Sequence, residues 1–368
     1  MNVESIRLIN FRNYNNLNIK LNNETNIFIG NNAQGKTNLL ESIYICATGR
    51  SFRTNRDKEI INLNKNQAYI GAKIKVNGTE KFIEIKMDRN KQKRIRINRV
   101  ELKNFRELHS GLNVVVFSPD DLKLIKDGPG ERRNFLDASI SQIKPIYKHN
   151  INRYNKILFQ RNNLLKSNKT KSDTLKLLEI FDLQLTKVGV EIIISRYKFI
   201  RELSKIAENI HKNLTLKKER LTINYISNID LTQENKDIME KDFITKLKLN
   251  INKDLALGTT EIGPHRDDME IKINNMNART FASQGQQRTI VLSIKLSEVE
   301  IIKLDKGNYP VLLLDDVFSE LDEERRKYLT MSFNGKQTII TSTDLMDLGK
   351  IEEINKSIFY IKDGIILW

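Results

Sequence analysis

The chain has 368 residues, 39% of them hydrophobic and 29% charged, which is normal for a soluble globular protein and long enough for two lobes. Its apolar runs are far shorter than the roughly 18 residues of a membrane span, and the N-terminus lacks signal-peptide character, so we expect a cytoplasmic protein with no membrane partner. A single cysteine excludes a disulfide framework, while the net charge of +16 favours an anionic partner such as nucleic acid. The abundance of Asn, Ile and Lys has a second explanation, an AT-rich genome.

The first quarter of the chain reads mainly as strands. Short, partly alternating segments, the last two joined by an Asn-Gly turn, predict strands at residues 6–11, 17–21, 26–29, 70–76 and 82–87. Between the third and fourth of these, residues 36–48 carry apolar side chains at the helical period, and Cys46 lies among these apolar positions. We therefore expect a helix there, with Cys46 buried on its apolar face.

The middle of the chain reads as helical, and strand character returns after it. Apolar side chains recur at helical spacing in residues 143–165 and 175–209, whereas residues 269–273, 311–314 and 338–341 are strand-like. This order predicts a discontinuous α/β lobe, residues 1–118 plus 259–368, interrupted by a mainly helical lobe at residues 119–258.

A phosphate-binding loop lies between the third strand and the first helix. Residues 30–37 match the pattern Gly-x-x-x-x-Gly-Lys-[Ser/Thr] at every fixed position. Glycines allow backbone N–H groups to surround phosphates, the lysine reaches the β and γ oxygens, and the hydroxyl serves Mg²⁺. An incidental glycine turn is the alternative. The predicted ATP-binding residues are Gly30, Asn31, Asn32, Ala33, Gln34, Gly35, Lys36 and Thr37.

Two carboxylates end the apolar run at residues 311–314. A buried parallel strand explains the run, and the C-terminal ends of such strands carry ligands in doubly wound sheets. We expect Asp315 to hold Mg²⁺ together with Thr37, and Asp316 to act as the general base that polarises the attacking water. A strand that simply runs into an acidic turn is the alternative interpretation.

A second candidate for phosphate recognition precedes a long predicted helix at residues 288–304. Ser283 and Gln286 have the spacing of a capping box, which is a purely structural interpretation. The same geometry, with Gly285, also presents donors at a helix N-terminus, which is suited to a γ-phosphate. Together with the phosphate loop it defines the ABC-type sandwich, in which Ser283, Gly285 and Gln286 of one subunit close over the ATP of the other.

These motifs, followed by Ser319-Glu320-Leu321-Asp322, resemble in their order the heads of SMC-like ABC ATPases. Three further stretches narrow the resemblance to the RecF family: residues 11–14 (Phe-Arg-Asn-Tyr), residues 119–137 and residues 263–268 (Gly-Pro-His-Arg-Asp-Asp). Residues 143–257 carry little family-specific pattern. The resemblance implies an α/β fold of the ABC-type P-loop ATPase head with an inserted helical lobe.

The resemblance also implies a function. RecF proteins are cytoplasmic bacterial proteins of recombinational repair and replication restart that recognise gaps, where single- and double-stranded DNA meet. With RecR and RecO they help to load the RecA recombinase. They bind ATP, form homodimers with it and hydrolyse it weakly in a DNA-dependent manner. By the same resemblance, Asp322 lies in the D-loop at the dimer interface.

Departures from other ABC proteins separate the alternatives. No glutamine occurs at residues 118–121, where ABC heads carry a Q-loop, and no histidine occurs at residues 341–344, where transporters carry a switch histidine. A chromosome-organising SMC head would need a long heptad segment after the phosphate loop, which is lacking here. Slow turnover fits these departures. Two alternatives stay open, an ATP-gated DNA clamp without meaningful hydrolysis and another SMC-like ABC ATPase.

Two basic stretches are candidates for the DNA surface. Residues 86–106 contain nine Lys or Arg against two acidic residues, with alternation at residues 94–97, and residues 138–172 contain no acidic residue. Clustered positive charge neutralises phosphates, but an ordinary solvated basic face is the alternative for both. The candidates are Lys93, Arg94, Arg96, Lys144, Lys148 and Arg153. His265 and Arg266 could contact the nucleotide, DNA or only the lobe interface, and the sequence leaves these three roles open.

Overall fold

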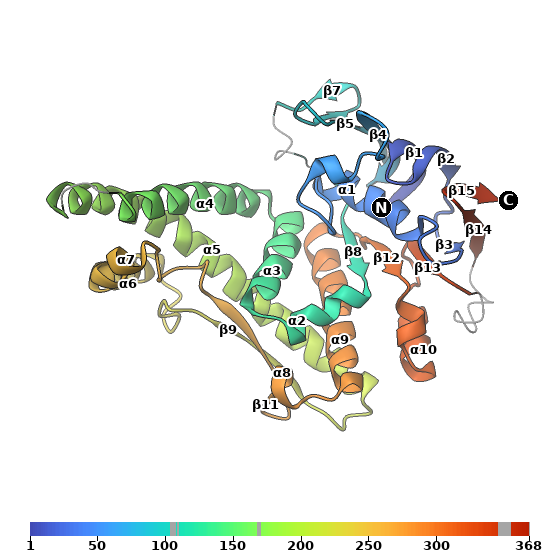
Figure 1. Cartoon of the computed structure of the whole chain (residues 1–368). Helices are drawn as coiled ribbons and strands as arrows, with labels where there is room; N and C mark the ends of the chain where they lie inside the picture. The colour runs from blue at the N-terminus through green and yellow to red at the C-terminus, as the bar shows by residue number, and fades with distance from the viewer. Residues whose placement is uncertain (104–107, 109, 168–170, 345–354, 368) are drawn as a thin grey trace. The chain divides into compact units, whose positions relative to one another are not determined.

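We describe the chain from a computed structural model, which covers residues 1–103, 108, 110–167, 171–344 and 355–367, without the side chains of residues 171–174. The chain divides into two compact units, Met1–Asp121 with Leu292–Trp368, and Leu122–Val291. Helix α9 (Gln284–Lys306) runs through the second boundary. Each unit is described by itself (Figure 1).

The first unit contains two sheets and the helices that pack on them. Its elements are β1 (Asn2–Phe11), β2 (Tyr14–Lys20), β3 (Thr25–Ile29), α1 (Lys36–Thr48), η1 (Asp57–Glu59), β4 (Gln67–Val76), β5 (Thr79–Asp88), β6 (Arg94–Ile97), β7 (Val100–Glu101), β8 (Val114–Phe117), β12 (Val311–Asp315), η4 (Val317–Glu320), α10 (Glu323–Met331), β13 (Thr338–Ser342), β14 (Lys356–Lys362) and β15 (Ile365–Leu367). All the strands expected from the sequence within this unit are present.

The mainly parallel sheet has the strand order β15-β14-β3-β13-β12-β8. Strands β3, β12 and β13 are buried along their whole length, which explains their continuous apolar runs, since a parallel sheet is covered on both faces. Strand β13 pairs with β3 on one side and with β12 on the other, all parallel. The C-terminal ends of these three strands therefore meet at one edge, where α1 begins after β3.

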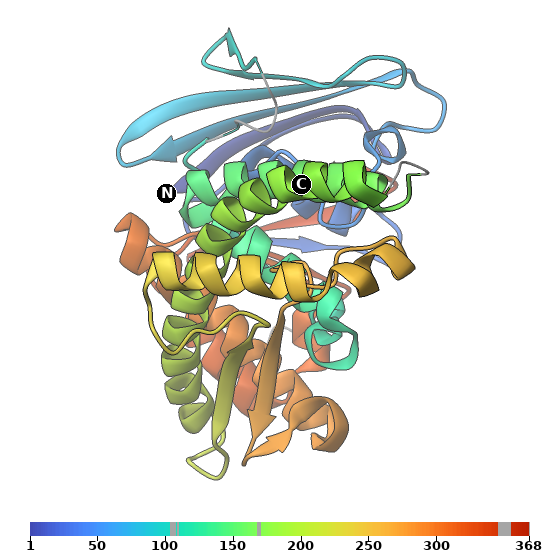
Figure 2. The same ribbon diagram turned by 90° about the vertical axis from the view of Figure 1, so that its left-hand side faces the viewer.

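The antiparallel sheet has the order β2-β1-β4-β5-β6-β7. Its long strands β1, β4 and β5, blue to cyan in Figure 2, run alongside one another. Alternate residues of β1, β4 and β5 are buried, and those between them face outward, as expected for a sheet with one solvated face. Helix α1 packs against strands of both sheets, and its side chains join their common apolar core.

The second unit is mainly helical but also contains a small sheet. Its elements are α2 (Lys123–Lys126), α3 (Pro129–Ile143), α4 (Pro145–Leu165), α5 (Lys171–Leu214), β9 (Leu221–Ile226), α6 (Lys236–Leu249), α7 (Ile251–Leu257), β10 (Asp268–Ile273), β11 (Met276–Asn277) and α8 (Ala278–Phe281), and η3 (Pro119–Leu122) leads into it. The long helices α4 and α5 pack against each other (Figure 1), and the sheet has the order β11-β10-β9.

The second unit extends further along the chain than the helical lobe expected from the sequence. That lobe ends at residue 258, whereas the compact unit continues to Val291. The cause is strand pairing: β10 pairs with β9 along its whole length, and α3 packs on β10. In the described part of the chain, none of the helices combines the length and apolar character that crossing a membrane requires.

Candidate nucleotide site

The phosphate loop connects β3 to α1 and is shaped by unusual backbone angles. Ala33 and Gly35 have positive φ angles of 66° and 115°. A Cβ atom on Gly35 would lie 2.7 Å from the Nδ2 atom of Asn13, so glycine is required there for two separate reasons. The Lys36 side chain is only 4% exposed, and its Nζ atom donates to the carbonyls of Gly30 at 2.6 Å and Asn31 at 3.3 Å. The lysine is thus folded back over the concave side of the loop.

A hydroxyl–carboxylate pair lies beside the loop. Thr37, at the start of α1, donates its Oγ1 hydrogen to Oδ1 of Asp315, at the end of β12, over 2.8 Å. Thr341, on the neighbouring strand β13, donates to the same carboxylate oxygen over 2.8 Å and is fully buried. Asp315 is 8% exposed, so two hydroxyls hold a largely buried carboxylate in one orientation.

Asp316 differs from Asp315 in both exposure and backbone. Its φ angle is +51°, and its side chain is 31% exposed. Its backbone N–H donates to Thr341 Oγ1 at 3.1 Å, and its carboxylate lies 3.8 Å from Lys36 Nζ. A non-glycine residue in the left-handed region costs about 1–3 kcal/mol, and such residues cluster at functional sites. The turn therefore places a second, more accessible carboxylate next to the lysine.

The Phe-Arg-Asn-Tyr stretch at residues 11–14 is hydrogen-bonded to the phosphate loop. Asn13 donates from Nδ2 to the carbonyl of Gln34 at 2.9 Å, and Tyr14 donates its hydroxyl to the carbonyl of Gly35 at 3.0 Å. Arg12 forms a two-pronged ion pair with the fully buried Glu41 of α1, at 2.7 and 2.9 Å. The sequence connects this stretch with the RecF resemblance but does not predict these contacts.

The turn between β14 and β15 supports the loop from another direction. The backbone N–H of Gly364 donates to the Gln34 carbonyl at 3.1 Å, and that of Asp363 donates to the Gln34 side chain. Two separate segments, residues 13–14 and 363–364, thus fix the middle of the loop. A fixed loop with inward-facing backbone donors holds phosphate oxygens without reorganising.

The residues present fit a magnesium-bound nucleoside triphosphate. The backbone of the loop and Lys36 supply donors for phosphates, and the oxygens of Thr37 and Asp315 are ligands that Mg²⁺ takes. Within the described residues, no group of three or more His, Cys, Asp or Glu side chains could hold a metal. A magnesium ion here would therefore depend on these two side chains and on the phosphates themselves, as in P-loop enzymes.

The predicted signature residues lie at the N-terminus of α9, in the second unit. Ser283 and Gln286 form a reciprocal capping box: the Ser283 N–H donates to Gln286 Oε1 at 2.8 Å, and the Gln286 N–H donates to Ser283 Oγ at 3.3 Å. Ser283 is exposed, Gly285 is half-buried, and the first turn of α9 carries no acidic residue. Gln286 also donates from Nε2 to the Glu219 carboxylate at 2.8 Å, so an acidic side chain from another segment lies at this helix start. The capping interpretation and the phosphate interpretation do not exclude each other.

Asp322 caps the N-terminus of α10 in the first unit. Its carboxylate accepts from the backbone N–H of Arg325 at 3.0 Å, pairs with the guanidinium of the same arginine, and stays 55% exposed. The cap gives this residue a structural role whatever its part in a D-loop.

Comparisons with known proteins identify the family. The family model described as the RecF/RecN/SMC N terminal domain matches residues 2–365. The DNA replication and repair protein RecF of Alkaliphilus oremlandii (strain OhILAs) is 45% identical over 365 residues, covering 99% of either chain. The chain belongs to the RecF family.

Solved structures of the family agree. The recombination mediator protein RecF-ATPrS in the RecFOR pathway has a TM-score of 0.91 at 35% identity, covering 99% of this chain and 97% of that one. An SMC head bound to the C-winged helix domain of ScpA has a TM-score of 0.55 at 15% identity, covering 100% and 96%, and shares the fold. The expected fold class, an α/β ABC-type P-loop ATPase head with an inserted helical lobe, is confirmed.

Two of the RecF-like stretches bind each other within the second unit. Arg132 is largely buried and forms a two-pronged ion pair with Asp268, at 2.7 and 2.9 Å. Arg133 donates to the carbonyl of Asp267 at 2.9 Å. Asp137 accepts from Arg196, which also donates to the carbonyl of Pro264 at 2.6 Å. This RecF-family pattern therefore joins α3 and α5 to the start of β10.

His265 and Arg266, whose roles the sequence left open, have partners inside the second unit. The His265 ring contacts the Tyr154 hydroxyl and the carbonyl of Thr260, each at 2.8 Å, and burial lowers the pKa of His265 from 6.5 to about 4. Arg266 pairs with Glu261. At neutral pH His265 is thus an uncharged packing residue.

The candidate basic residues of the first unit differ in their availability. Lys93, which we expected on the DNA surface, is instead 5% exposed and binds the Gly49 carbonyl at 2.8 Å and Asp57 at 2.9 Å. Arg96 pairs with Glu101 at 3.1 Å, whereas Arg94 is exposed. Lys93 looked accessible because a sequence does not reveal that η1 folds back over it. The end of this stretch, residues 104–106, lies outside the described residues.

The candidate basic residues of the second unit lie at or on α4. Lys144 is exposed at the N-cap of that helix, Lys148 is half-buried, and Arg153 is exposed. Residues 168–170, near the end of the same basic stretch, lie outside the described residues.

Proposed function

We propose that this chain binds MgATP at the phosphate loop and hydrolyses it slowly. The observation that carries the proposal is the Thr37–Asp315 contact of 2.8 Å beside Lys36, because it joins the loop, the strand-end carboxylate and a half-exposed Asp316 in one site. In this proposal Lys36 binds the β and γ oxygens of ATP. Residues 30–37 bind the triphosphate through their backbone.

Each side chain then has a separate task. Thr37 and Asp315 hold Mg²⁺, which neutralises phosphate charge when bound. Asp316 orients the attacking water and accepts its proton. Its exposure suits that task, because water must reach it, while the burial of Asp315 suits a fixed ligand. The positive φ of Asp316 points its side chain differently from that of Asp315.

We further propose an ATP-dependent homodimer. Ser283, Gly285 and Gln286 of one subunit would bind the γ-phosphate of the ATP held by the other, with Asp322 in the D-loop at the interface. The exposed Ser283 and the lack of acidic residues in the first turn of α9 itself support this proposal, since a helix N-terminus favours an anion.

The biological role we propose is that of the family. The protein acts in the cytoplasm in recombinational repair and replication restart, binds gapped DNA and assists RecA loading together with RecR and RecO. The family membership and the net charge of +16 support this role. Arg94, Lys144 and Arg153 are the predicted cations best placed for phosphates, because all three are exposed.

Single-turnover hydrolysis tests the enzymatic part. With enzyme in excess over ATP, with and without gapped DNA, the wild-type protein should convert bound ATP to ADP. Asp316→Asn should retain ATP binding but slow that step by about 10²- to 10⁴-fold, the usual contribution of a general base. Equal rates would remove Asp316 from its role, and ATP-dependent dimers without any hydrolysis would establish the clamp alternative instead.

Sedimentation with ATP in the presence of gapped or blunt DNA, across a salt series, tests the DNA part. We expect gapped DNA to bind more tightly and both affinities to fall steeply with salt. Equal binding of the two DNAs would contradict gap recognition.

A further inference from the structure

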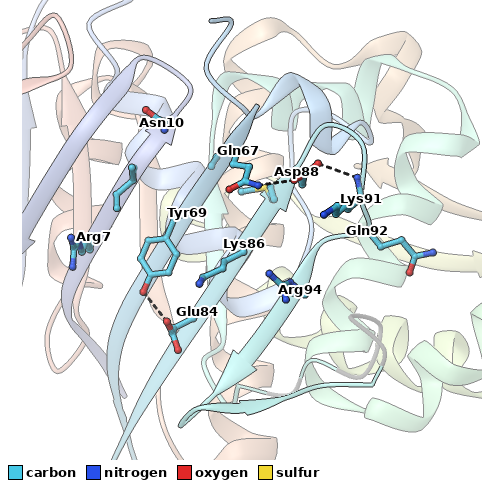
Figure 3. Close-up of a pocket in the computed structure, with 13 residues that line it drawn as sticks. Arg7, Asn10, Gln67, Tyr69, Glu84, Lys86, Asp88, Lys91, Gln92 and Arg94 are labelled. Carbon is cyan, nitrogen blue, oxygen red and sulfur yellow. Dashed lines mark hydrogen bonds between the residues drawn. The ribbon is translucent and has the colours of Figure 1, made fainter. Parts of the chain in front are cut away.

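A hollow of about 470 Å³ lies on the outer face of the antiparallel sheet, where strands β1, β4, β5 and β6 run side by side (Figure 3). Its size falls within the range of roughly 300–1,000 Å³ typical of small-molecule sites. All of its lining residues belong to the first unit, between Arg7 and Arg94. It lies apart from residues 30–37, none of which lines it.

The floor of the hollow is an aromatic ring laid against the backbone. Tyr69 of β4 is half-buried, and its ring passes over Gly71. A Cβ atom on Gly71 would lie 2.8 Å from the Tyr69 hydroxyl and 3.0 Å from its Cε1 atom, so only glycine lets the ring lie this low. One face of the ring is thus covered by the strand, and the other lines the hollow.

The tyrosine hydroxyl is held in place and uncharged. It donates to Glu84 on the neighbouring strand β5 at 3.1 Å (Figure 3). Burial and the Glu84 carboxylate raise the pKa of Tyr69 to about 12, so the ring stays neutral under physiological conditions. A neutral ring fixed at both ends is a flat surface for stacking.

The charges around the ring favour an anion. Four cations, Arg7, Lys86, Lys91 and Arg94, and two carboxylates, Glu84 and Asp88, line the hollow. Both carboxylates are already engaged: Glu84 by Tyr69, and Asp88 by the Gln67 side chain at 2.9 Å and the Asn90 amide at 2.8 Å. Among the described residues, no carboxylate lies within ion-pair distance of Arg7, Lys86 or Arg94.

The cations also lie on both sides of the ring. Arg7 on β1 is opposite Gly71, and Lys86 on β5 is opposite Tyr69 and next to Arg94 on β6. Because β4 lies between them, the strands carrying Arg7 and Lys86 are roughly 10 Å apart. A planar group on the ring would therefore have a cation available at either edge.

We propose that this hollow binds an unpaired nucleotide of single-stranded DNA, with its base stacked on Tyr69 and the adjoining phosphates held by Arg7, Lys86 and Arg94. Base–aromatic stacking inside a basic groove is the usual way in which proteins hold single strands without reading sequence. A duplex keeps its bases stacked on one another and cannot place one on a ring that lies this low. The proposal rests on the DNA binding proposed above, and it makes this hollow the binding site for the single-stranded part of gapped DNA.

The experiment compares single-stranded DNA, gapped duplex and blunt duplex for binding to the full chain at fixed salt, with 2-aminopurine in the single strand as a stacking probe. Tyr69→Leu should weaken single-strand binding roughly 5- to 150-fold and abolish the stacking-induced quenching of 2-aminopurine. Tyr69→Phe, which keeps the ring, should bind within about twofold of wild type. Arg7→Gln should reduce the salt dependence of single-strand binding by about 0.7 in log–log slope.

Phe82→Leu is the matched control, because Phe82 is a partly exposed aromatic residue of β5 that does not line the hollow. It should leave single-strand binding and quenching unchanged. The proposed site would be overturned if Tyr69→Leu bound single strands with wild-type affinity, or if Phe82→Leu lost as much affinity as Tyr69→Leu. Either result would leave the wild type's binding of gapped DNA, and so the proposed function, untouched. An equal loss for blunt duplex would overturn the stacking of an unpaired base. If wild-type protein bound no DNA at all, the proposed function would fail together with the site.

Discussion

Replacing Thr341 by valine tests the arrangement of the candidate nucleotide site. The side chains have nearly the same shape, so the change removes one hydroxyl from the fully buried end of β13. That hydroxyl donates to Asp315 at 2.8 Å and accepts from the Asp316 N–H at 3.1 Å. Asp315 keeps its bond from Thr37, and the Asp316 N–H keeps the Thr341 carbonyl as a 3.3 Å partner.

The expected cost follows from these contacts. A hydrogen bond to a charged group contributes about 1.5–3 kcal/mol and a neutral one about 0.5–1.5 kcal/mol. Since each partner retains a second contact, we expect a loss of about 2–3 kcal/mol. If Asp315 binds Mg²⁺, loss of a hydroxyl that orients it should also raise the Mg²⁺ concentration for half-maximal single-turnover hydrolysis about 10- to 100-fold.

Hydrogen–deuterium exchange of peptides covering β12 and β13 measures the first effect. A loss of 2–3 kcal/mol corresponds to exchange roughly 30- to 150-fold faster. Thr25→Val is the matched control, because Thr25 is buried on β3 of the same sheet and its hydroxyl has no hydrogen-bond partner among the described residues. That variant should exchange no faster than wild type. Unchanged exchange and unchanged Mg²⁺ dependence in Thr341→Val would refute the reasoning.

Two further predictions concern the second unit. Arg132→Gln breaks the largely buried ion pair with Asp268 and should lower the free energy of unfolding in urea by about 3 kcal/mol. The control Arg201→Gln breaks an exposed ion pair and should lower it by less than about 1 kcal/mol. Equal effects of the two changes would contradict this prediction. Burial lowers the pKa of His265 from 6.5 to about 4, so its stabilising contribution is complete above pH 6.5 and is lost as pH falls toward 4, by about 2 kcal/mol at pH 5. His265→Asn should therefore lose less stability between pH 7 and pH 5 than wild type. Burial raises the pKa of Asp267 to about 6, so protonation of Asp267 stabilises the protein as the pH falls over the same range. This contribution is present in both wild type and His265→Asn, so it cancels when their stabilities are compared.

The sequence predicts those parts of the site that follow from a local pattern. The phosphate loop has fixed spacing, and the apolar run before Asp315 reads as a buried strand, so both could be located from a few consecutive residues. The capping spacing of Ser283 and Gln286 is local as well, and the structure contains that capping box. The division of the chain was anticipated in outline only, because the pairing of β10 with β9 joins segments more than 40 residues apart.

The parts that were missed depend on strand order and on side-chain packing. Thr341 reaches Asp315 only because β13 inserts between β3 and β12, a topology that no local pattern specifies. Asn13 supports the loop across the boundary between two sheets. Lys93 belongs to a stretch that reads as mostly basic, yet its side chain turns inward to Asp57. Alternation predicts which face a residue takes, but not which partner it finds there.

Analytical ultracentrifugation of wild type and Lys36→Ala, each with and without MgATP, tests the central claim most directly. Lys36 is almost fully buried in the loop, and in the proposed function it binds the β and γ oxygens of ATP. We predict that ATP converts the wild-type protein to a dimer and leaves Lys36→Ala at its nucleotide-free sedimentation coefficient. A variant that dimerises with ATP as the wild type does would contradict the assignment of the loop.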